Sequence, residues 1–365
     1  MSGGRTALGG LAGWLALAGW LALAGCSAPD PGKAAEQSDS GRPEPDPDPD
    51  PGDRELCPVP PPDLPTEAVS LDRIYEKITG IYILPGTDTA LWSMVKVKDE
   101  PGRSPSRIQA YSSEDGLVWD DEPGCSIDLG PDGTWSQRGI GTASLRARGD
   151  GVEAWYRADD ADDYQAIGYV YSEDRCFFEP PMEPVLAPIE DWASAAVVGP
   201  HVLEAPNGEL WMYYRGSPHI NQSDSPLGLA TSADDGLTWT HWPDNPVMPM
   251  PETGWNSSLL GDPHVWREGD VWLMLVAGHD IPTTPEQSAN TVGLGKVVGV
   301  AASADGLEWV NCYDAPVLTD GLKVDNPFVW REGNDSVVYV RTTDRTDGSG
   351  GVLERVTWED WPRWE

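Results

Sequence analysis

Phenylalanine, basic residues and helix-type apolar patterns are scarce in this chain. There are 3 Phe against 18 Trp, and 24 Lys and Arg against 60 Asp and Glu, so the formal net charge of the 365 residues is −36. A surface this acidic repels phosphate backbones, so we expect no nucleic acid partner, and the charge is sufficient to keep an exported domain soluble. No segment of the domain has the 3.6-residue apolar period of an amphipathic helix, which argues against a helical fold.

Cysteine is also scarce, and the spacing of the five cysteines argues against a common class of metal site. No two of them form a Cys-x-x-Cys pair, so we expect no zinc centre. Cys26 closes the N-terminal apolar run, and the others are Cys57, Cys125, Cys176 and Cys312. An even number of cysteines in an exported protein predicts two disulfides, and the sequence leaves all three possible pairings open.

The first 26 residues have the pattern of an export signal. Arg5 supplies a positive charge, and an unbroken run of small and apolar residues follows from residue 8 to residue 25. A retained transmembrane anchor is the alternative interpretation, because the run is near the roughly 18 residues that span a bilayer. Leu23-Ala24-Gly25-Cys26 resembles the lipobox of bacterial lipoproteins, in which the cysteine is lipidated. The resemblance predicts an exported protein that a lipid on Cys26 anchors to the bacterial outer membrane or cell surface.

Residues 27–68 are predicted to form a disordered linker. They are rich in proline, aspartate, serine and glycine, and proline alternates with acids over residues 44–51. Proline removes backbone donors and the like charges repel one another, so the segment stays extended and solvated. A run of acids can bind calcium, but no fold makes these carboxylates converge. We therefore expect a tether that joins the lipid to a domain at residues 69–365.

The domain is built from repeats that carry strand and turn signals. The stretch from Gly261 to Gly278 reads as two strands around a polar turn. Similar stretches begin at Gly199 and Asp325, and a weaker copy begins at Ile140. The prolines that open the three clear copies are Pro200, Pro263 and Pro327. A repeat made only of strand and turn signals indicates a β-repeat array.

A second motif follows the hairpins and fixes the period. Ser232–Trp239 has the form Ser-x-Asp-x-Gly-x-x-Trp, and related segments end at Trp119, Phe178 and Trp309. The closing aromatics recur at roughly 60 residues, so residues 69–365 have room for five repeats. Four short antiparallel strands in each repeat predict an all-β fold, a five-bladed β-propeller.

These motifs resemble those of the five-bladed propeller glycoside hydrolases, the arabinanase, xylosidase and levansucrase-invertase group. Asp262-Pro263 is similar to the Asp-Pro that opens an inner strand in that group, and Ser303–Trp309 to its Ser-x-Asp-Gly-x-x-Trp. Asn245-Pro246-Val247 and Ala315-Pro316-Val317 resemble the segment that follows. Ser232–Trp239 also fits the Asp box of sialidases, a weaker similarity because sialidases have six blades. Both resemblances imply the architecture more strongly than an activity.

The resemblance implies two catalytic carboxylates on inner strands. Glycoside hydrolysis uses one carboxyl as proton donor and another as base or nucleophile. Asp262 stands directly before its proline, and Asp325 stands two residues before Pro327, where the family has a glutamate. The third repeat has Gly199 before its proline, and the first repeat has no Asp-Pro. The sequence therefore predicts a glycosidase of extracellular poly- or oligosaccharides that uses Asp262 and Asp325. A catalytically inactive propeller that binds carbohydrate or protein is the alternative.

Further side chains recur at fixed places in the repeats and are candidates for substrate binding. They are His201 and His264 after the proline, Arg157, Arg215 and Arg341 at the end of a second strand, and Trp255 before an inner strand. Converging arginines can bind a carboxylated sugar, and indole rings stack on sugars. The same residues can instead pack in the core or pair with acids. We expect a monomer that binds carbohydrate, with no cofactor and no metal, although calcium is possible.

Overall fold

The computed structural model describes residues 56–63, 66–71, 81–84, 91–98, 106–160, 162–189, 191–219, 224–279, 296–319, 323–343 and 352–364. These lie in the unit Pro49–Glu365. The predicted export signal, Cys26 and most of the linker lie outside the described residues. No helix among the described residues is long and apolar enough to cross a membrane.

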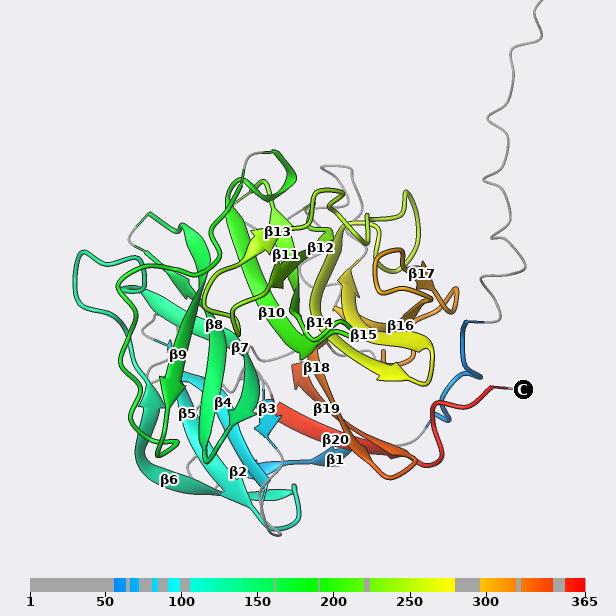
Figure 1. The fold of residues 1–365 in the computed structure, drawn as a ribbon. Helices are drawn as coiled ribbons and strands as arrows, with labels where there is room; N and C mark the ends of the chain where they lie inside the picture. The colour runs from blue at the N-terminus through cyan, green and yellow to red at the C-terminus, as the bar shows by residue number, and fades with distance from the viewer. Residues whose placement is uncertain are drawn as a thin grey trace, which may run out of the picture. The chain divides into compact units, whose positions relative to one another are not determined.

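The described residues form an all-β fold, as predicted, in which the only helical segment is the single 3₁₀ turn Asp191–Ala193. The first sheet has the order β2-β6-β5-β4-β3 and the last has β1-β20-β19-β18 (Figure 1). The first sheet consists of β2 (Ser70–Leu71), β3 (Ile81–Leu84), β4 (Leu91–Lys98), β5 (Ser106–Ser113) and β6 (Val118–Ile127). The last consists of β1 (Glu67–Ala68), β18 (Lys323–Glu332), β19 (Asp335–Thr343) and β20 (Val352–Trp358).

Between them lie a seven-stranded sheet, β13-β12-β11-β10-β9-β8-β7, and the sheet β14-β15-β16-β17. The seven-stranded sheet consists of β7 (Gly139–Arg148), β8 (Gly151–Asp159), β9 (Gln165–Ser172), β10 (Ala196–Glu204), β11 (Leu210–Ser217), β12 (Leu227–Ser232) and β13 (Thr240–His241). The other consists of β14 (Leu259–Glu268), β15 (Val271–His279), β16 (Val297–Ser303) and β17 (Val310–Asn311). A single parallel pair, Gln165 with Ala196, joins β9 to β10. The seven-stranded sheet is therefore two antiparallel sets, β7–β9 and β10–β13, and the described residues hold five sets that fit propeller blades.

The first strand of four sets carries a β-bulge at the same repeat position. The bulges interrupt β7, β10, β14 and β18. At each bulge one residue has a positive φ, namely Thr142 (26°), Gly199 (62°), Asp262 (47°) and Asn326 (50°). This region is unfavourable for residues other than glycine, and such strain is concentrated at functional sites. The bulge turns the backbone where the sequence places the Asp-Pro motif.

Tryptophans pack on glycines inside the sets. Trp255 lies over Gly278 of β15 and Gly299 of β16, where a Cβ atom would fall 2.3 and 2.2 Å from the indole. Trp192 lies in the same way over Gly216 and Gly228. Trp255 therefore fills the body of its sheet and is not among the residues that line the central cavity described below.

The Asp-box motifs form turns, as their sequence predicts. In the turn after β16, the Asp305 carboxylate accepts from the amide of Leu307 at 2.8 Å, and the indole of Trp309 donates to the carbonyl of Gly306 at 3.0 Å. Trp309 is buried, whereas Trp239 in the equivalent turn is only partly buried. The Asp-box acids are thus turn residues.

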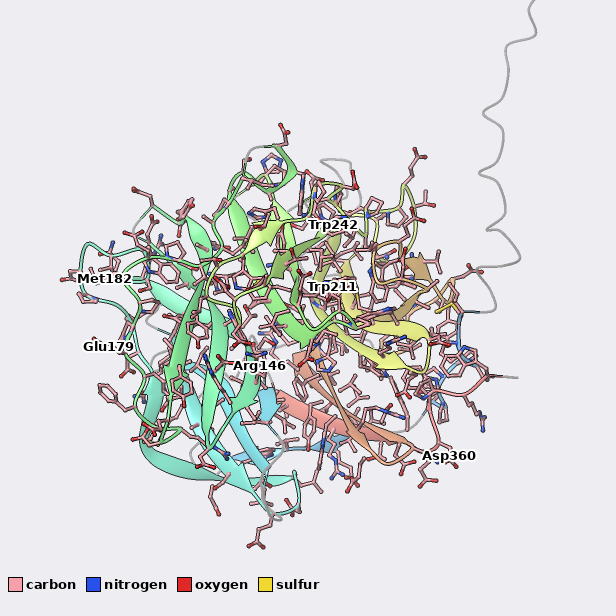
Figure 2. The ribbon with its side chains drawn as sticks, in the orientation of Figure 1. Arg146, Glu179, Met182, Trp211, Trp242 and Asp360 are labelled. Carbon is pink, nitrogen blue, oxygen red and sulfur yellow. A yellow bond between two sulfur atoms is a disulfide. The ribbon has the colours of Figure 1, made fainter. Side chains whose placement is uncertain are left out.

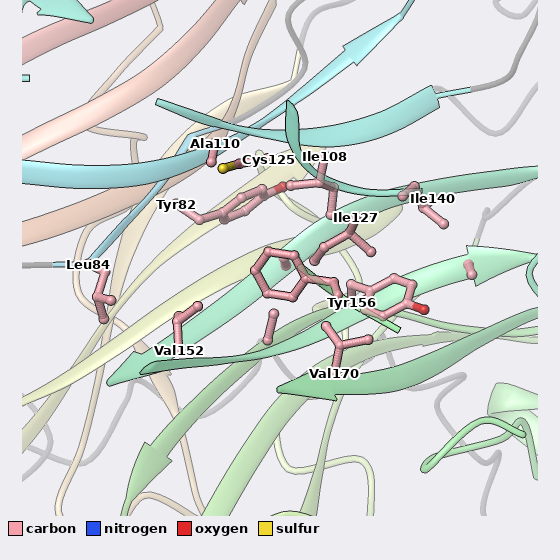
Figure 3. Packing of buried hydrophobic residues seen from close by; sticks show 14 residues of the cluster. Tyr82, Leu84, Ile108, Ala110, Cys125, Ile127, Ile140, Val152, Tyr156 and Val170 are labelled. Atoms are coloured by element: carbon pink, nitrogen blue, oxygen red, sulfur yellow. The ribbon is translucent and has the colours of Figure 1, made fainter. Parts of the chain in front are cut away.

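The same turns hold neighbouring sets together. The Gly306 carbonyl also accepts from the hydroxyl of Tyr213 on β11, and the Gly116 carbonyl of the first sheet accepts from Tyr339 on β19. Apolar side chains fill the space between neighbouring sets. Figure 3 shows one such cluster, in which Tyr82 and Ile108 of the first sheet pack with Val152 and Tyr156 of β8.

Two disulfides form, as the cysteine count predicts, and they pair Cys57 with Cys312 and Cys125 with Cys176. The first ties residues 56–63, which we call the N-terminal strap, to the segment after β17. The Val59 amide donates to the Arg363 carbonyl at 2.7 Å, and β1 pairs with β20, so strands from both ends of the domain lie side by side (Figure 1). The packed part of the chain therefore begins before the predicted boundary at residue 69. The proline-rich composition of the strap concealed this, because the disulfide and the C-terminal partners hold it.

Candidate active site

The first strands of all five sets line one central cavity of about 150 Å³. The lining residues are Tyr82 and Ile83 of β3, Thr142–Leu145 of β7, Gly199–Val202 of β10, Asp262–His264 of β14 and Asn326–Phe328 of β18. Three of the bulge residues are followed by proline, and all four bulge residues line this cavity. Residues far apart in the sequence thus meet in one place.

Asp262 is the only carboxylate among the described residues that line this cavity. Its side chain is 9% exposed, and its Oδ2 lies 3.1 Å from the Nζ of Lys296. Burial favours the neutral acid, but Lys296 and Arg215 outweigh burial, so the pKa of Asp262 is lowered. Asp262 is therefore ionised near neutral pH.

Asp325 is not among the residues that line the cavity, and its carboxylate pairs with two cations. Its side chain is 1% exposed. The Nε and one Nη of Arg341 both donate to it at 2.6 Å, and Lys296 lies 3.4 Å from its Oδ2. This bidentate geometry is the strongest form of a carboxylate–arginine pair. The structure thus brings the two predicted carboxylates together around Lys296, and Asp325 is the more deeply buried of the two.

The three predicted arginines hold equivalent positions opposite the bulges. Arg157 pairs in register with Gly141, Arg215 with Val198, and Arg341 with Asp325. Arg157 forms an ion pair with Asp159, and Arg341 with Asp325. The three arginines thus share one repeat position, and for Arg157 and Arg341 the acid partners that the sequence left open are present.

Lys296 was missed by the sequence prediction. In β15 the position equivalent to the arginines is Ala277, which pairs with Gly261. Lys296 comes from the residue before β16 and supplies a cation at this fourth position. The sequence signals this cation only by lacking an arginine at Ala277, and that absence does not show which residue supplies the charge.

His201 and His264 both face the cavity and connect first strands. The Nε2 of His201 donates to the Val265 carbonyl at 2.7 Å, and His264 bonds the backbone of Val329 in the next set. Their ring centroids are 4.3 Å apart. Burial lowers the pKa of His201 to about 4 and, with His201 beside it, lowers the pKa of His264 well below its ordinary value. Both imidazoles are therefore neutral near pH 7, and each forms a hydrogen bond with the backbone of a neighbouring first strand.

Tyr82 is a second residue that the sequence did not reveal. It lines the cavity from β3 and is 8% exposed, and its hydroxyl, which the backbone of Ala143 approaches, has no acceptor for its proton within the described ranges. Burial, followed by the charge of Asp262, raises its pKa. The hydroxyl is therefore protonated and can donate to a ligand. The first repeat thus supplies a tyrosine where an acid was sought.

Nothing in the described residues gathers three or more His, Cys, Asp or Glu into a group that could hold a metal ion. The acidic residues that follow β8, Asp160, Asp162 and Asp163, make contacts with other protein groups. The Asp160 carboxylate accepts from the Asp162 amide at 2.8 Å, and Arg138 pairs with Asp163.

In chemical terms the cavity offers acceptors and one uncommitted donor. Asp262 presents an ionised carboxylate, Tyr82 a hydroxyl, and the histidines uncharged rings. Hydrolysis of a glycosidic bond needs a carboxyl that holds its proton near neutrality. No described cavity residue meets that requirement, whereas hydroxyl groups of a sugar fit these partners.

Comparison with known proteins supports the expected resemblance. The family model for the N-terminal domain of glycosyl hydrolases family 32 matches residues 108–286. No curated protein matches the chain significantly.

Among solved structures, a glycoside hydrolase shares 17% identity at a TM-score of 0.64, covering 84% of this chain and 94% of its own. An endo-arabinase from Bacteroides thetaiotaomicron shares 13% at 0.57, covering 77% and 94%. A β-1,2-mannobiose phosphorylase from Listeria innocua shares 14% at 0.55, covering 84% and 95%. At these identities the likeness shows the fold. The resemblance to propeller glycoside hydrolases is confirmed.

Proposed function

We propose that this glycoside hydrolase-like protein is a cell-surface glycan-binding module that has kept the scaffold without a working pair of catalytic carboxyls. The five antiparallel sets close into a five-bladed propeller, and a lipid on Cys26 tethers it to the membrane. Closure is supported by one contact. Tyr339 of the last set reaches the Gly116 turn of the first in the same way that Tyr213 reaches the Gly306 turn of the next set.

The observation that carries this proposal is the state of the two predicted catalytic acids. Asp262 is held ionised beside Lys296, and Asp325 is occupied by Arg341. A general acid needs a raised pKa, which this surrounding opposes. The remaining polar groups on the cavity wall suit hydrogen bonds to sugar hydroxyls.

Binding is tested with the full-length protein and three neutral oligosaccharides, arabinohexaose, xylohexaose and mannohexaose, by saturation-transfer difference NMR. We expect at least one to bind, and we expect Tyr82→Phe and Asp262→Asn each to weaken that binding. Exposed Asp270→Asn is the matched control and should bind as wild type does, because its side chain lies outside the cavity. Binding that is equal in all four proteins contradicts the central site.

A glycosidase is the second candidate, because of the distance between the acids. Lys296 Nζ lies 3.1 Å from the Oδ2 of Asp262 and 3.4 Å from the Oδ2 of Asp325. The two oxygens are therefore at most about 6.5 Å apart, near the separations of ~5–5.5 Å and ~6.5–9.5 Å that serve retention and inversion. Release of sugar from any of the three probes, lost in Asp262→Asn with the melting temperature unchanged, would establish this candidate and exclude the first.

A further inference from the structure

A second crevice, which shares no lining residue with the central cavity, lies between the segment after β13 and the turn before β17. One of its lining residues, Trp242, is labelled in Figure 2. Its volume is about 370 Å³, against about 150 Å³ for the central cavity. The lining residues are Trp242, Asp244, Pro246, Val247, Pro249, Asp305, Leu307, Glu308 and Trp309.

Trp242 is not required at its position by the repeat. Its amide donates to the Leu229 carbonyl at 2.8 Å, and in the next repeat the amide of Cys312 donates to Val300 at 2.9 Å in the same manner. The fold thus accepts a different side chain there, and in that repeat it is a disulfide-bonded cysteine. The partly buried indole of Trp242 adds an aromatic wall to the crevice. Trp309, whose indole nitrogen is engaged by Gly306, lines the crevice with it.

The polar groups of the crevice are acceptors. Asp244 and Glu308 are exposed, and within the part of the chain that the structure describes their carboxylates have no ion pair or hydrogen bond. Asp305 uses Oδ1 for its own turn. Among the residues that the structure describes, no lysine, arginine or histidine lines the crevice. The electrostatics therefore oppose an anionic ligand and favour one that donates hydrogen bonds.

We infer that this crevice is a second saccharide-binding site, in which a neutral sugar stacks on Trp242 and its hydroxyls donate hydrogen bonds to Asp244 and Glu308. An indole face offers apolar area to the C–H groups of a sugar ring, and carboxylates are strong acceptors of hydroxyl protons. The site is separate from the central cavity, so it goes beyond the function proposed above. A chain with two sites can hold one glycan at two points, which raises the overall affinity.

The test uses full-length Trp242→Ala and the three neutral hexasaccharides, with trigalacturonic acid as the anionic probe. Each protein also carries Tyr82→Phe, so that binding at the central cavity is weakened throughout. We expect a neutral probe to bind this background, and Trp242→Ala to reduce the affinity about tenfold or more. Phe177→Ala removes a more exposed aromatic from a segment beside β6, away from the crevice, and should leave binding unchanged. Trigalacturonic acid should not bind.

A second variant keeps the test decisive if Trp242→Ala lowers stability. Asp244→Asn with Glu308→Gln changes only exposed groups, so the protein should melt as wild type does while its affinity falls several-fold. Unchanged affinity in both variants, or preference for the anionic probe, overturns the second site. Binding that is lost with Tyr82→Phe alone overturns the second site and leaves the central one standing. Binding that depends on Trp242 alone supports the second site and removes the central one.

Discussion

Replacement of Asp325 by asparagine should destabilise the protein strongly, because it leaves buried cations without their partner. The Asp325 side chain is 1% exposed and that of Arg341 is 14% exposed, and two hydrogen bonds of 2.6 Å join them. Lys296 also approaches the same carboxylate. Removal of one member of a buried ion pair costs about 3–5 kcal/mol, because the other charge stays buried without compensation.

Urea denaturation of Asp325→Asn and wild type measures this difference. The control is Asp270→Asn, which removes the exposed partner of Arg267 at 3.3 Å and should change the free energy of unfolding by about 0–1 kcal/mol. Asp325→Asn combined with Arg341→Met should cost less than Asp325→Asn alone, since neither member of the pair then remains unmatched. A loss below about 1 kcal/mol for Asp325→Asn would refute the view that this acid is a buried structural anchor.

Three further predictions concern the histidines, the strap and the lipid. Wild-type stability should fall as the pH drops below the unfolded histidine pKa of 6.5, because the unfolded chain binds protons that folded His201 and His264 do not. His264→Phe should reduce the change of unfolding free energy with pH, measured by urea denaturation at several pH values. Loss of the Cys57–Cys312 disulfide through paired serine substitutions should cost about 2–5 kcal/mol and expose the strap to protease, which mass spectrometry of the fragments detects. Cys26→Ser should abolish palmitate labelling, and equal labelling would contradict lipidation.

The architecture was accessible from the sequence because its signals recur. The Asp-box glycines and tryptophans mark turns, and the prolines at 200, 263 and 327 mark bulges in the first strands. A periodic pattern reports positions with the same backbone environment, so strand order and the convergence of Asp262 with Asp325 could be anticipated. The strap could not, because its composition is that of a linker and its partners are distant in the sequence.

The chemistry of the site was less accessible, because it depends on residues outside the repeat pattern. Lys296 holds Asp262 ionised, and Tyr82 supplies a hydroxyl from a strand with no motif. The pKa of a carboxyl is set by burial and neighbouring charges, neither of which a motif specifies. The histidines illustrate the same limit, since their shared position revealed that they lie together but not that His201 bonds to Val265.

The central claim is that the cavity binds a glycan without cleaving it. The most direct measurement follows one neutral hexasaccharide with the full-length protein, recording saturation-transfer NMR for binding and chromatography for released sugar in the same sample. We expect binding that Asp262→Asn and Tyr82→Phe weaken, with no sugar released by any of the proteins. Release of sugar by wild type that disappears in Asp262→Asn would contradict it and identify the protein as a glycosidase.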